Sequence, residues 1–64
     1  MSEITVNDAE RIRRSMGISV YEFSVRLGYS PTAYKYAIKK KSISRWMARE
    51  ISIRYGKLLA EVRG

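Results

Sequence analysis

The stretch over about residues 19–40 carries start and stop signals for two short helices set close together. Ser19 is followed three residues later by Glu22, which is the spacing of a capping box at a helix start. Gly28 suits a helix end, because glycine adopts the left-handed backbone conformation at little cost. The Ser-Pro pair at 30–31 marks the next start, with serine as N-cap and proline at the first helical position. Helices joined by so short a turn must cross steeply, which predicts a helix-turn-helix motif.

The apolar residues of this stretch support that geometry. They recur at i/i+4 spacing, on the sides that two crossed helices turn toward each other and toward a core. These residues are Phe23, Leu27, Tyr34, Ala37 and Ile38. The phase of Tyr34 assigns it to the core, whereas Tyr36 faces outward.

Four positions in this stretch also resemble a known motif. A small residue is followed by glycine four positions later, and by apolar residues six and nine positions after the glycine, at Ser24, Gly28, Tyr34 and Ala37. This pattern resembles that of the phage Cro and repressor family of helix-turn-helix proteins. The resemblance implies a small all-α, lambda-repressor-like domain of four or five helices. The second motif helix would enter the major groove of double-stranded DNA, while the first crosses the phosphate backbone.

Length and composition limit the other possibilities. The chain has 64 residues, which we interpret as a single domain over 1–64 with one small core. It contains no cysteine and no histidine, so we expect neither a disulfide nor a metal site, and we expect no cofactor. The six acidic residues are scattered and mostly explained as helix caps, so no enzyme and no small-molecule substrate are expected. No apolar run suits a membrane span or a signal peptide, which predicts a cytoplasmic, nucleoid-associated protein.

Positive charge is concentrated in one part of the chain. The formal charge is +7, from 13 lysines and arginines against six acidic residues, and such an excess indicates a polyanionic partner. Three of the acids lie in the first ten residues, whereas residues 26–57 hold nine basic residues and only Glu50. The second motif helix and the segment after it therefore carry most of the positive charge.

The first three helices have predictable limits. Residues 1–6 are expected as an extended lead whose apolar groups pack on the first helix. Asn7 is a good N-cap for that helix, which is expected over about 8–16. The two motif helices are expected over about 20–27 and from 31 to 39 or 40.

The last third of the chain leaves two alternatives open. Ser42 or Ser44 can cap a further helix that includes Trp46, which we assign to the core. Its apolar stripe crosses Gly56 without losing phase, so either one long helix bends there or a fifth helix follows. The end of the stripe either closes the monomer core or forms a dimer contact, and it comprises Tyr55, Leu58, Leu59 and Val62.

The resemblance also assigns residues to DNA. Its place in the motif makes the outward face of the second helix the candidate for base contact, namely Thr32, Ala33, Lys35, Tyr36 and Lys39. Their chemistry fits this role, because threonine and alanine methyl groups meet thymine methyls, lysine donates to guanine, and tyrosine forms hydrogen bonds. The candidates for phosphate contact flank this face, namely Ser30, Lys40, Lys41, Arg45 and Arg49.

These features predict a sequence-specific DNA-binding transcriptional regulator, acting as a steric repressor from a phage, plasmid or bacterial chromosome. A module of this size buries only about 600–1,000 Å² on DNA, so we expect a homodimer on a pseudo-palindromic operator, formed in solution or only on DNA. Two rivals stay open. One is an excisionase-like or architectural DNA binder, and the other is a basic module that engages an acidic protein surface. Steep salt dependence of binding favours DNA over a protein partner.

Overall fold

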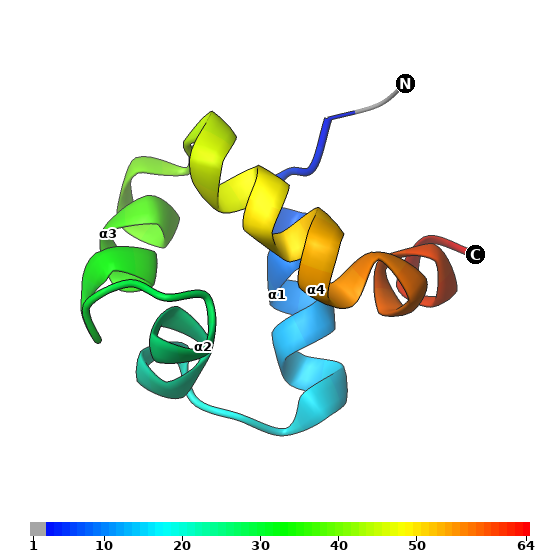
Figure 1. Ribbon diagram of the computed structural model, residues 1–64, viewed down its shortest axis with the longest axis horizontal. Helices are drawn as coiled ribbons and strands as arrows, with labels where there is room; N and C mark the ends of the chain where they lie inside the picture. Colours follow the sequence, from blue (N-terminus) through cyan, green and yellow to red (C-terminus); the bar gives the residue numbers. More distant parts are fainter. Residues whose placement is uncertain (1–2) are drawn as a thin grey trace.

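The computed structural model describes residues 3–64, and within them the chain forms four α-helices and no β-strand. The helices are α1 (Val6–Met16), α2 (Val20–Arg26), α3 (Ala33–Lys40) and α4 (Arg45–Arg63). They pack as two pairs, α1 against α4 and α2 against α3 (Figure 1). In this view α2 and α3 lie to the left of α1, and α4 crosses in front of it. The all-α prediction is confirmed, and α2 with α3 are the two helices of the expected motif.

The first helix begins earlier than predicted. Thr5 is its N-cap, because the Thr5 hydroxyl accepts from the Asp8 N–H at 3.2 Å while the Asp8 carboxylate accepts from the Thr5 N–H at 3.0 Å. Asn7 therefore lies inside α1, and its assignment as the cap is wrong. Of the expected extended lead, residues 1–2 fall outside the described part of the chain. Ile4 packs against the core, whereas Val6 is the first residue of α1 and not part of an extended lead.

The start and stop of α2 match the sequence signals. The Ser19 hydroxyl accepts from the Glu22 N–H at 3.1 Å, and Gly28 has the left-handed φ of 87°. The Glu22 carboxylate is held by Arg26, with Nη2 and Oε2 2.6 Å apart. Only the Ser19 half of the predicted capping box forms, because the Glu22 side chain pairs with Arg26 along the helix rather than with the Ser19 N–H.

The start of α3 departs from the prediction. Ser30 is not its N-cap; Thr32 stands there, and Thr32 makes no side-chain cap bond. Instead, the buried Ser24 hydroxyl of α2 accepts from the Tyr34 N–H at 3.1 Å and donates to the Ser30 carbonyl. The first-turn N–H groups of a helix lack partners inside that helix. Ser24 therefore caps α3 from the neighbouring helix and ties the turn to it.

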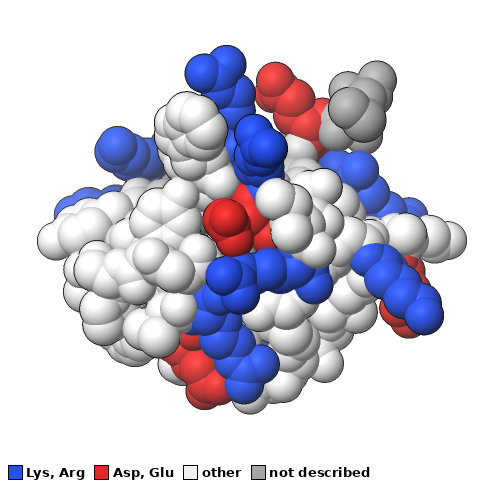
Figure 2. Space-filling model, in the orientation of Figure 1, with Lys and Arg blue, Asp and Glu red and all other residues white. Residues whose placement is uncertain are grey.

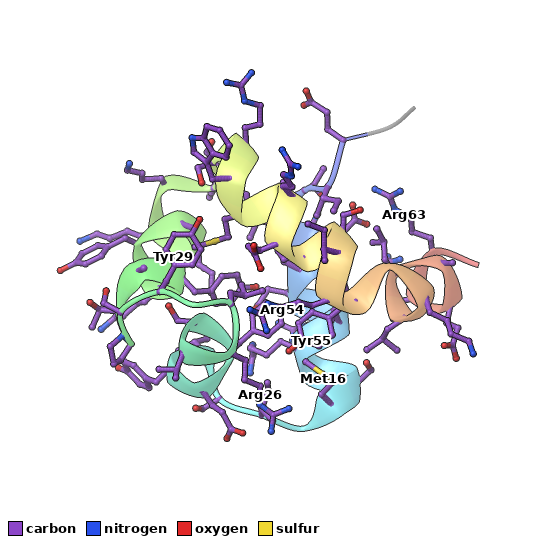
Figure 3. All side chains as sticks on the ribbon, in the orientation of Figure 1. Met16, Arg26, Tyr29, Arg54, Tyr55 and Arg63 are labelled. Carbon is purple, nitrogen blue, oxygen red and sulfur yellow. The ribbon has the colours of Figure 1, made fainter. Side chains whose placement is uncertain are left out.

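One cluster of aromatic and aliphatic side chains joins the two helix pairs. The ring of Phe23 meets Tyr34 edge-on, with centroids 4.8 Å apart, and lies 5.7 Å from the ring of Tyr55. Figure 3 shows Tyr55 where α4 bends, on the side toward α2. The buried set confirms the assignment of Tyr34 to the core and comprises Ala9, Ile12, Phe23, Leu27, Tyr34, Ala37, Met47, Ile51 and Leu59.

The last helix, α4, is divided by a kink. The Ser44 hydroxyl accepts from the Met47 N–H at 3.1 Å, which makes Ser44 the cap. Tyr55, with φ −128° and ψ 25°, is the one non-helical residue inside α4, and it directly precedes Gly56. The break expected at Gly56 thus lies one residue earlier, at Tyr55, where two helical segments of α4 meet in a kink. Within residues 3–64, no helix combines the length and the apolar character needed to cross a membrane.

The C-terminal stripe packs on the monomer. Leu59 is buried, and Tyr55, Leu58 and Val62 are half-buried against the core. For Leu59 this is the core-closing alternative, whereas a dimer contact through Tyr55, Leu58 and Val62 stays a prediction. Leu59 is not exposed for contact with a second copy.

Trp46 overturns a prediction. Its side chain is 63% exposed rather than part of the core. Met47 and Ile51, one turn apart, form the buried face of this part of α4. Trp46 is one position away from Met47, about 100° around the helix, and therefore points off that face.

Candidate nucleic-acid interface

The outer face of α3 is open to solvent. Lys35, Tyr36 and Lys39 are exposed, and Tyr36 is 59% exposed. Together with Thr32 and Ile38 they line a hollow of about 540 Å³. The other side of the helix is buried through Tyr34 and Ala37. Thus α3 separates a core face from a polar and cationic face, as the sequence predicted.

Ala33 lies apart from the other predicted base contacts. It is half-buried and packs against the core, and it does not line the hollow. Ala33 stands four positions before the buried Ala37, so it lies on the core side of α3. Four of the five predicted base contacts therefore share one surface.

The cations of this region have no carboxylate partners. No acidic residue occurs between Glu22 and Glu50. Within residues 3–64, the ion pairs involve Arg13, Arg14, Arg26, Arg54 and Arg63. None of them includes the six basic residues that follow Arg26 and precede Glu50, namely Lys35, Lys39, Lys40, Lys41, Arg45 and Arg49. Figure 2 shows blue side chains projecting at the upper left, over the end of α3 and the beginning of α4.

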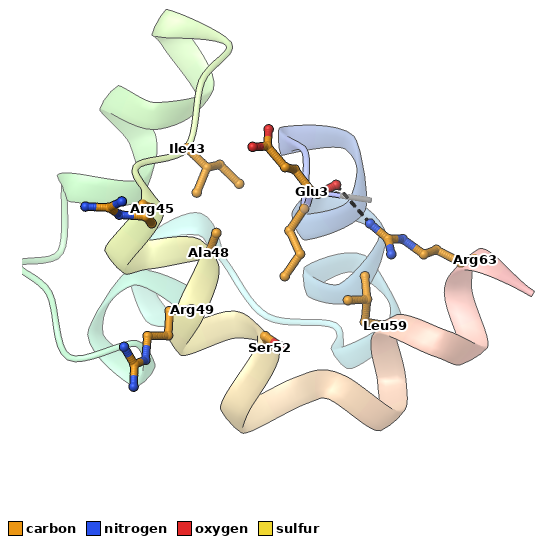
Figure 4. A pocket seen from close by; sticks show the side chains of 9 residues that line it. Glu3, Ile43, Arg45, Ala48, Arg49, Ser52, Leu59 and Arg63 are labelled. Atoms are coloured by element: carbon orange, nitrogen blue, oxygen red, sulfur yellow. Dashed lines mark hydrogen bonds between the residues drawn. The ribbon is translucent and has the colours of Figure 1, made fainter. Parts of the chain in front are cut away.

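The predicted phosphate contacts fall into separate groups. Lys40 and Lys41 are exposed at the end of α3, where Lys41 takes the left-handed φ of 57° and turns the chain toward α4. Ser30 is exposed in the turn before α3. Arg45 and Arg49 instead line a groove of about 500 Å³ along α4 (Figure 4). This groove shares no lining residue with the hollow on α3.

A polar network that the sequence analysis missed holds α3 in place. The Tyr34 hydroxyl donates to Glu10 Oε2 at 2.7 Å, and Arg13 Nε donates to the same oxygen at 2.8 Å. The hydrogen bonds from Arg13 hold the pKa of Glu10 below its ordinary value, against the effect of burial. Burial and the Glu10 carboxylate raise the pKa of Tyr34, which stays protonated. The i/i+3 spacing of Glu10 and Arg13 was a detectable signal, but their link to Tyr34 depends on the fold.

The arrangement supplies hydrogen-bond donors and positive charge on an unobstructed helix face. Among residues 3–64 no group of three acidic side chains gathers as a metal site would require. Comparisons with protein-family models, curated proteins and solved structures found no match. The chemistry of the α3 face therefore carries the functional inference.

Proposed function

We propose that this protein is a sequence-specific, double-stranded DNA-binding transcriptional regulator of the helix-turn-helix type. One observation carries the proposal. Lys35, Tyr36 and Lys39 stand exposed on the outer face of α3, in a stretch that contains no acidic residue. An α-helix fits the major groove of B-DNA, where such side chains reach base edges.

The proposed role of each residue on α3 follows from its position along the helix. Lys35 and Lys39 donate to guanine O6 and N7 or to phosphate oxygens, and Tyr36 hydrogen-bonds or lies against the groove wall. The Thr32 methyl, at the start of the helix, would meet a thymine methyl. Lys40 and Lys41, at the end of α3, neutralise phosphates and fix the register on the duplex.

In this proposal the protein regulates transcription by occupying a promoter. One module buries only about 600–1,000 Å² on DNA, which limits the specificity of a single copy. Two copies on a pseudo-palindrome, with half-sites about one helical turn apart, would double that contact and block RNA polymerase sterically. The proposal thus includes a repressor that acts as a homodimer, assembled in solution or on the operator. It fits the resemblance of the motif to the phage Cro and repressor family.

Selection from a random DNA library tests the proposal. The purified protein is incubated with randomised duplexes at near-physiological salt, and the retained molecules are sequenced. A two-fold motif with half-sites about one turn apart is the expected result. Enriched direct repeats would favour an excisionase-like binder, and retention without a motif would favour an architectural one. A library that is not retained contradicts DNA binding altogether.

A further inference from the structure

The first half of α4 carries a second exposed surface. Trp46 and Ile53 have the largest exposed fractions of the exposed large apolar residues described, at 63% and 66%. They are seven positions apart, so they project from the same side of the helix, two turns apart. Single exposed apolar residues are common, so the case for an interaction site depends on what lies beside these two.

Two arginines adjoin this face of α4. Arg49 stands between Trp46 and Ile53, three positions after the first and four before the second. The guanidinium of Arg45 lies 5.5 Å from the centre of the Trp46 ring. Within residues 3–64 neither arginine pairs with a carboxylate. By contrast, Arg54 on the next turn is held by Glu50 at 2.8 Å. Arg45 and Arg49 are therefore available to a carboxylate from outside the chain.

A groove of about 500 Å³ continues this surface toward the N-terminal segment (Figure 4). Arg45 and Arg49 line it on the α4 side. Beyond them, Arg63 is already occupied, by Asp8 at 2.7 Å and by the Glu3 carbonyl at 3.0 Å. The rest of the lining comprises four apolar residues, Ile4, Ile43, Ala48 and Leu59, together with Ser52 and the exposed Glu3 at the N-terminal end of the groove.

Unpaired arginines beside apolar side chains favour one class of binding partner over the others. A DNA backbone would satisfy the arginines, but it offers no apolar group for the groove or for Trp46 and Ile53. A second copy of the chain would bring a charge of +7 to a positively charged surface. A helical segment with carboxylates on one side and aliphatic residues on the other would satisfy both features. Tryptophan and arginine are also among the residues most enriched where a few side chains dominate binding energy.

We propose that the outer face of α4 from Arg45 to Ile53, with the adjoining groove, docks an acidic amphipathic segment of a partner protein. The face is separate from the hollow on α3. The inference does not depend on the proposed DNA binding. Where both hold, the protein can engage DNA and a partner at the same time.

Trp46 is the only tryptophan in the chain, so its fluorescence reports on this face directly. Three synthetic helical peptides serve as probes. The first carries a glutamate face and a leucine face, the second replaces the glutamates with lysine, and the third replaces the leucines with serine. We expect only the first to shift Trp46 emission to the blue as the indole leaves water. The double variant Arg45→Gln/Arg49→Gln should weaken this binding by about tenfold or more.

The matched control is Lys35→Gln/Lys39→Gln, which removes two charges from α3 and should bind the acidic peptide as the wild type does. Emission unchanged by the acidic peptide, or changed equally by the basic one, overturns the proposal. So does a blue shift that depends only on protein concentration, which would identify a second copy as the occupant. If a duplex DNA shifts the Trp46 emission and binds Arg45→Gln/Arg49→Gln more weakly than the wild type, these arginines contact phosphate. That outcome also overturns the proposal. Peptide binding without any duplex binding would refute the DNA proposal and leave this one intact.

Discussion

The Tyr34 hydroxyl in α3 donates to Glu10 Oε2 in α1 at 2.7 Å, across 24 positions of sequence. Arg13 completes the link, because it holds both oxygens of Glu10, at 2.8 and 3.0 Å, and donates to the Ile18 carbonyl at 2.8 Å. Since α3 packs chiefly on α2, this network is a direct polar connection from α3 to α1. It fixes the orientation of the face that carries Lys35 and Tyr36.

Tyr34→Phe should destabilise the fold by about 1–3 kcal/mol, because it removes a hydrogen bond to a charged group and keeps the ring. The Glu10 carboxylate still pairs with Arg13 in this variant, so the loss of stability stays within about 1–3 kcal/mol, the value of one such hydrogen bond. Urea unfolding followed by circular dichroism gives the free energy of unfolding. Tyr36→Phe is the control, since its ring is 59% exposed, and it should leave stability unchanged. Equal stability of the wild type and Tyr34→Phe would contradict a structural role for this bond.

Ser24→Ala should destabilise the fold by about 1–3 kcal/mol, because it leaves the buried Tyr34 N–H without an acceptor and the Ser30 carbonyl without this donor. Ser52→Ala, at an exposed position of α4, should change the free energy of unfolding by less than about 0.5 kcal/mol. Urea unfolding of both variants makes the comparison. If Ser24→Ala unfolds like Ser52→Ala, capping of α3 by Ser24 is refuted.

Sequence patterns predicted the parts of this fold that depend on local chemistry. Ser19, Gly28 and the apolar phase of Phe23 and Tyr34 located α2, the turn and the core side of α3. Each of these signals acts within a few residues. The start of α3 was misplaced because its cap comes from Ser24, which lies in another helix.

Trp46 shows a second limit of sequence patterns. Large apolar residues are usually buried, and Trp46 is close enough to Met47 for helical phase to decide between burial and exposure. A stripe through Met47 and Ile51 leaves Trp46 and Ile53 on another face. The same limit applies to the candidate interface. Phase predicted the exposure of Tyr36, whereas the separation of Arg45 and Arg49 from the α3 hollow depends on the packing of α4.

Trp46→Ala should therefore change the free energy of unfolding by less than about 0.5 kcal/mol, as exposed substitutions do. Met47→Ala, one position on, removes a side chain only 4% exposed and should cost about 2–5 kcal/mol. Thermal unfolding of the two variants and the wild type provides the test. If Trp46→Ala loses more stability than Met47→Ala, the tryptophan belongs to the core.

Acid should weaken the contact between the two ends of the chain. The hydrogen bond from Arg63 at 2.7 Å is the main cause that lowers the pKa of Asp8 from 3.8 to about 2. As the pH falls, Asp8 is protonated in the unfolded chain before it is protonated in the folded one. The stabilisation that the ion pair with Arg63 gives the fold is therefore complete above the unfolded pKa of 3.8 and is lost as the pH falls toward 2. Because Arg63 is exposed, solvent screening keeps this stabilisation well below the full value of the pKa shift.

Asp8→Asn isolates the contribution of this charge, since an amide oxygen can still accept from the Thr5 N–H. The difference in unfolding free energy between the wild type and Asp8→Asn should be greatest near neutral pH and vanish in acid. Glu61→Gln is the control, because Glu61 is exposed and forms no ion pair within residues 3–64. A pH-independent difference for Asp8→Asn would mean that the pair with Arg63 adds no stability.

Lys35→Ala/Tyr36→Ala should abolish discrimination between operator and random duplex while leaving the fold intact, because both side chains face solvent on α3. Lys40→Gln/Lys41→Gln should behave differently, since groups that bind phosphate carry no sequence information. It should weaken binding to all duplexes alike and reduce the slope of log affinity against log salt by about 0.9 for each phosphate that is no longer neutralised. Fluorescence anisotropy with a selected and a scrambled duplex, across a salt series, separates the two effects. Lys35 and Tyr36 lie on the outer face of α3, whereas Lys40 and Lys41 lie at its end. If Lys35→Ala/Tyr36→Ala keeps the site preference of the wild type, α3 is not the recognition helix.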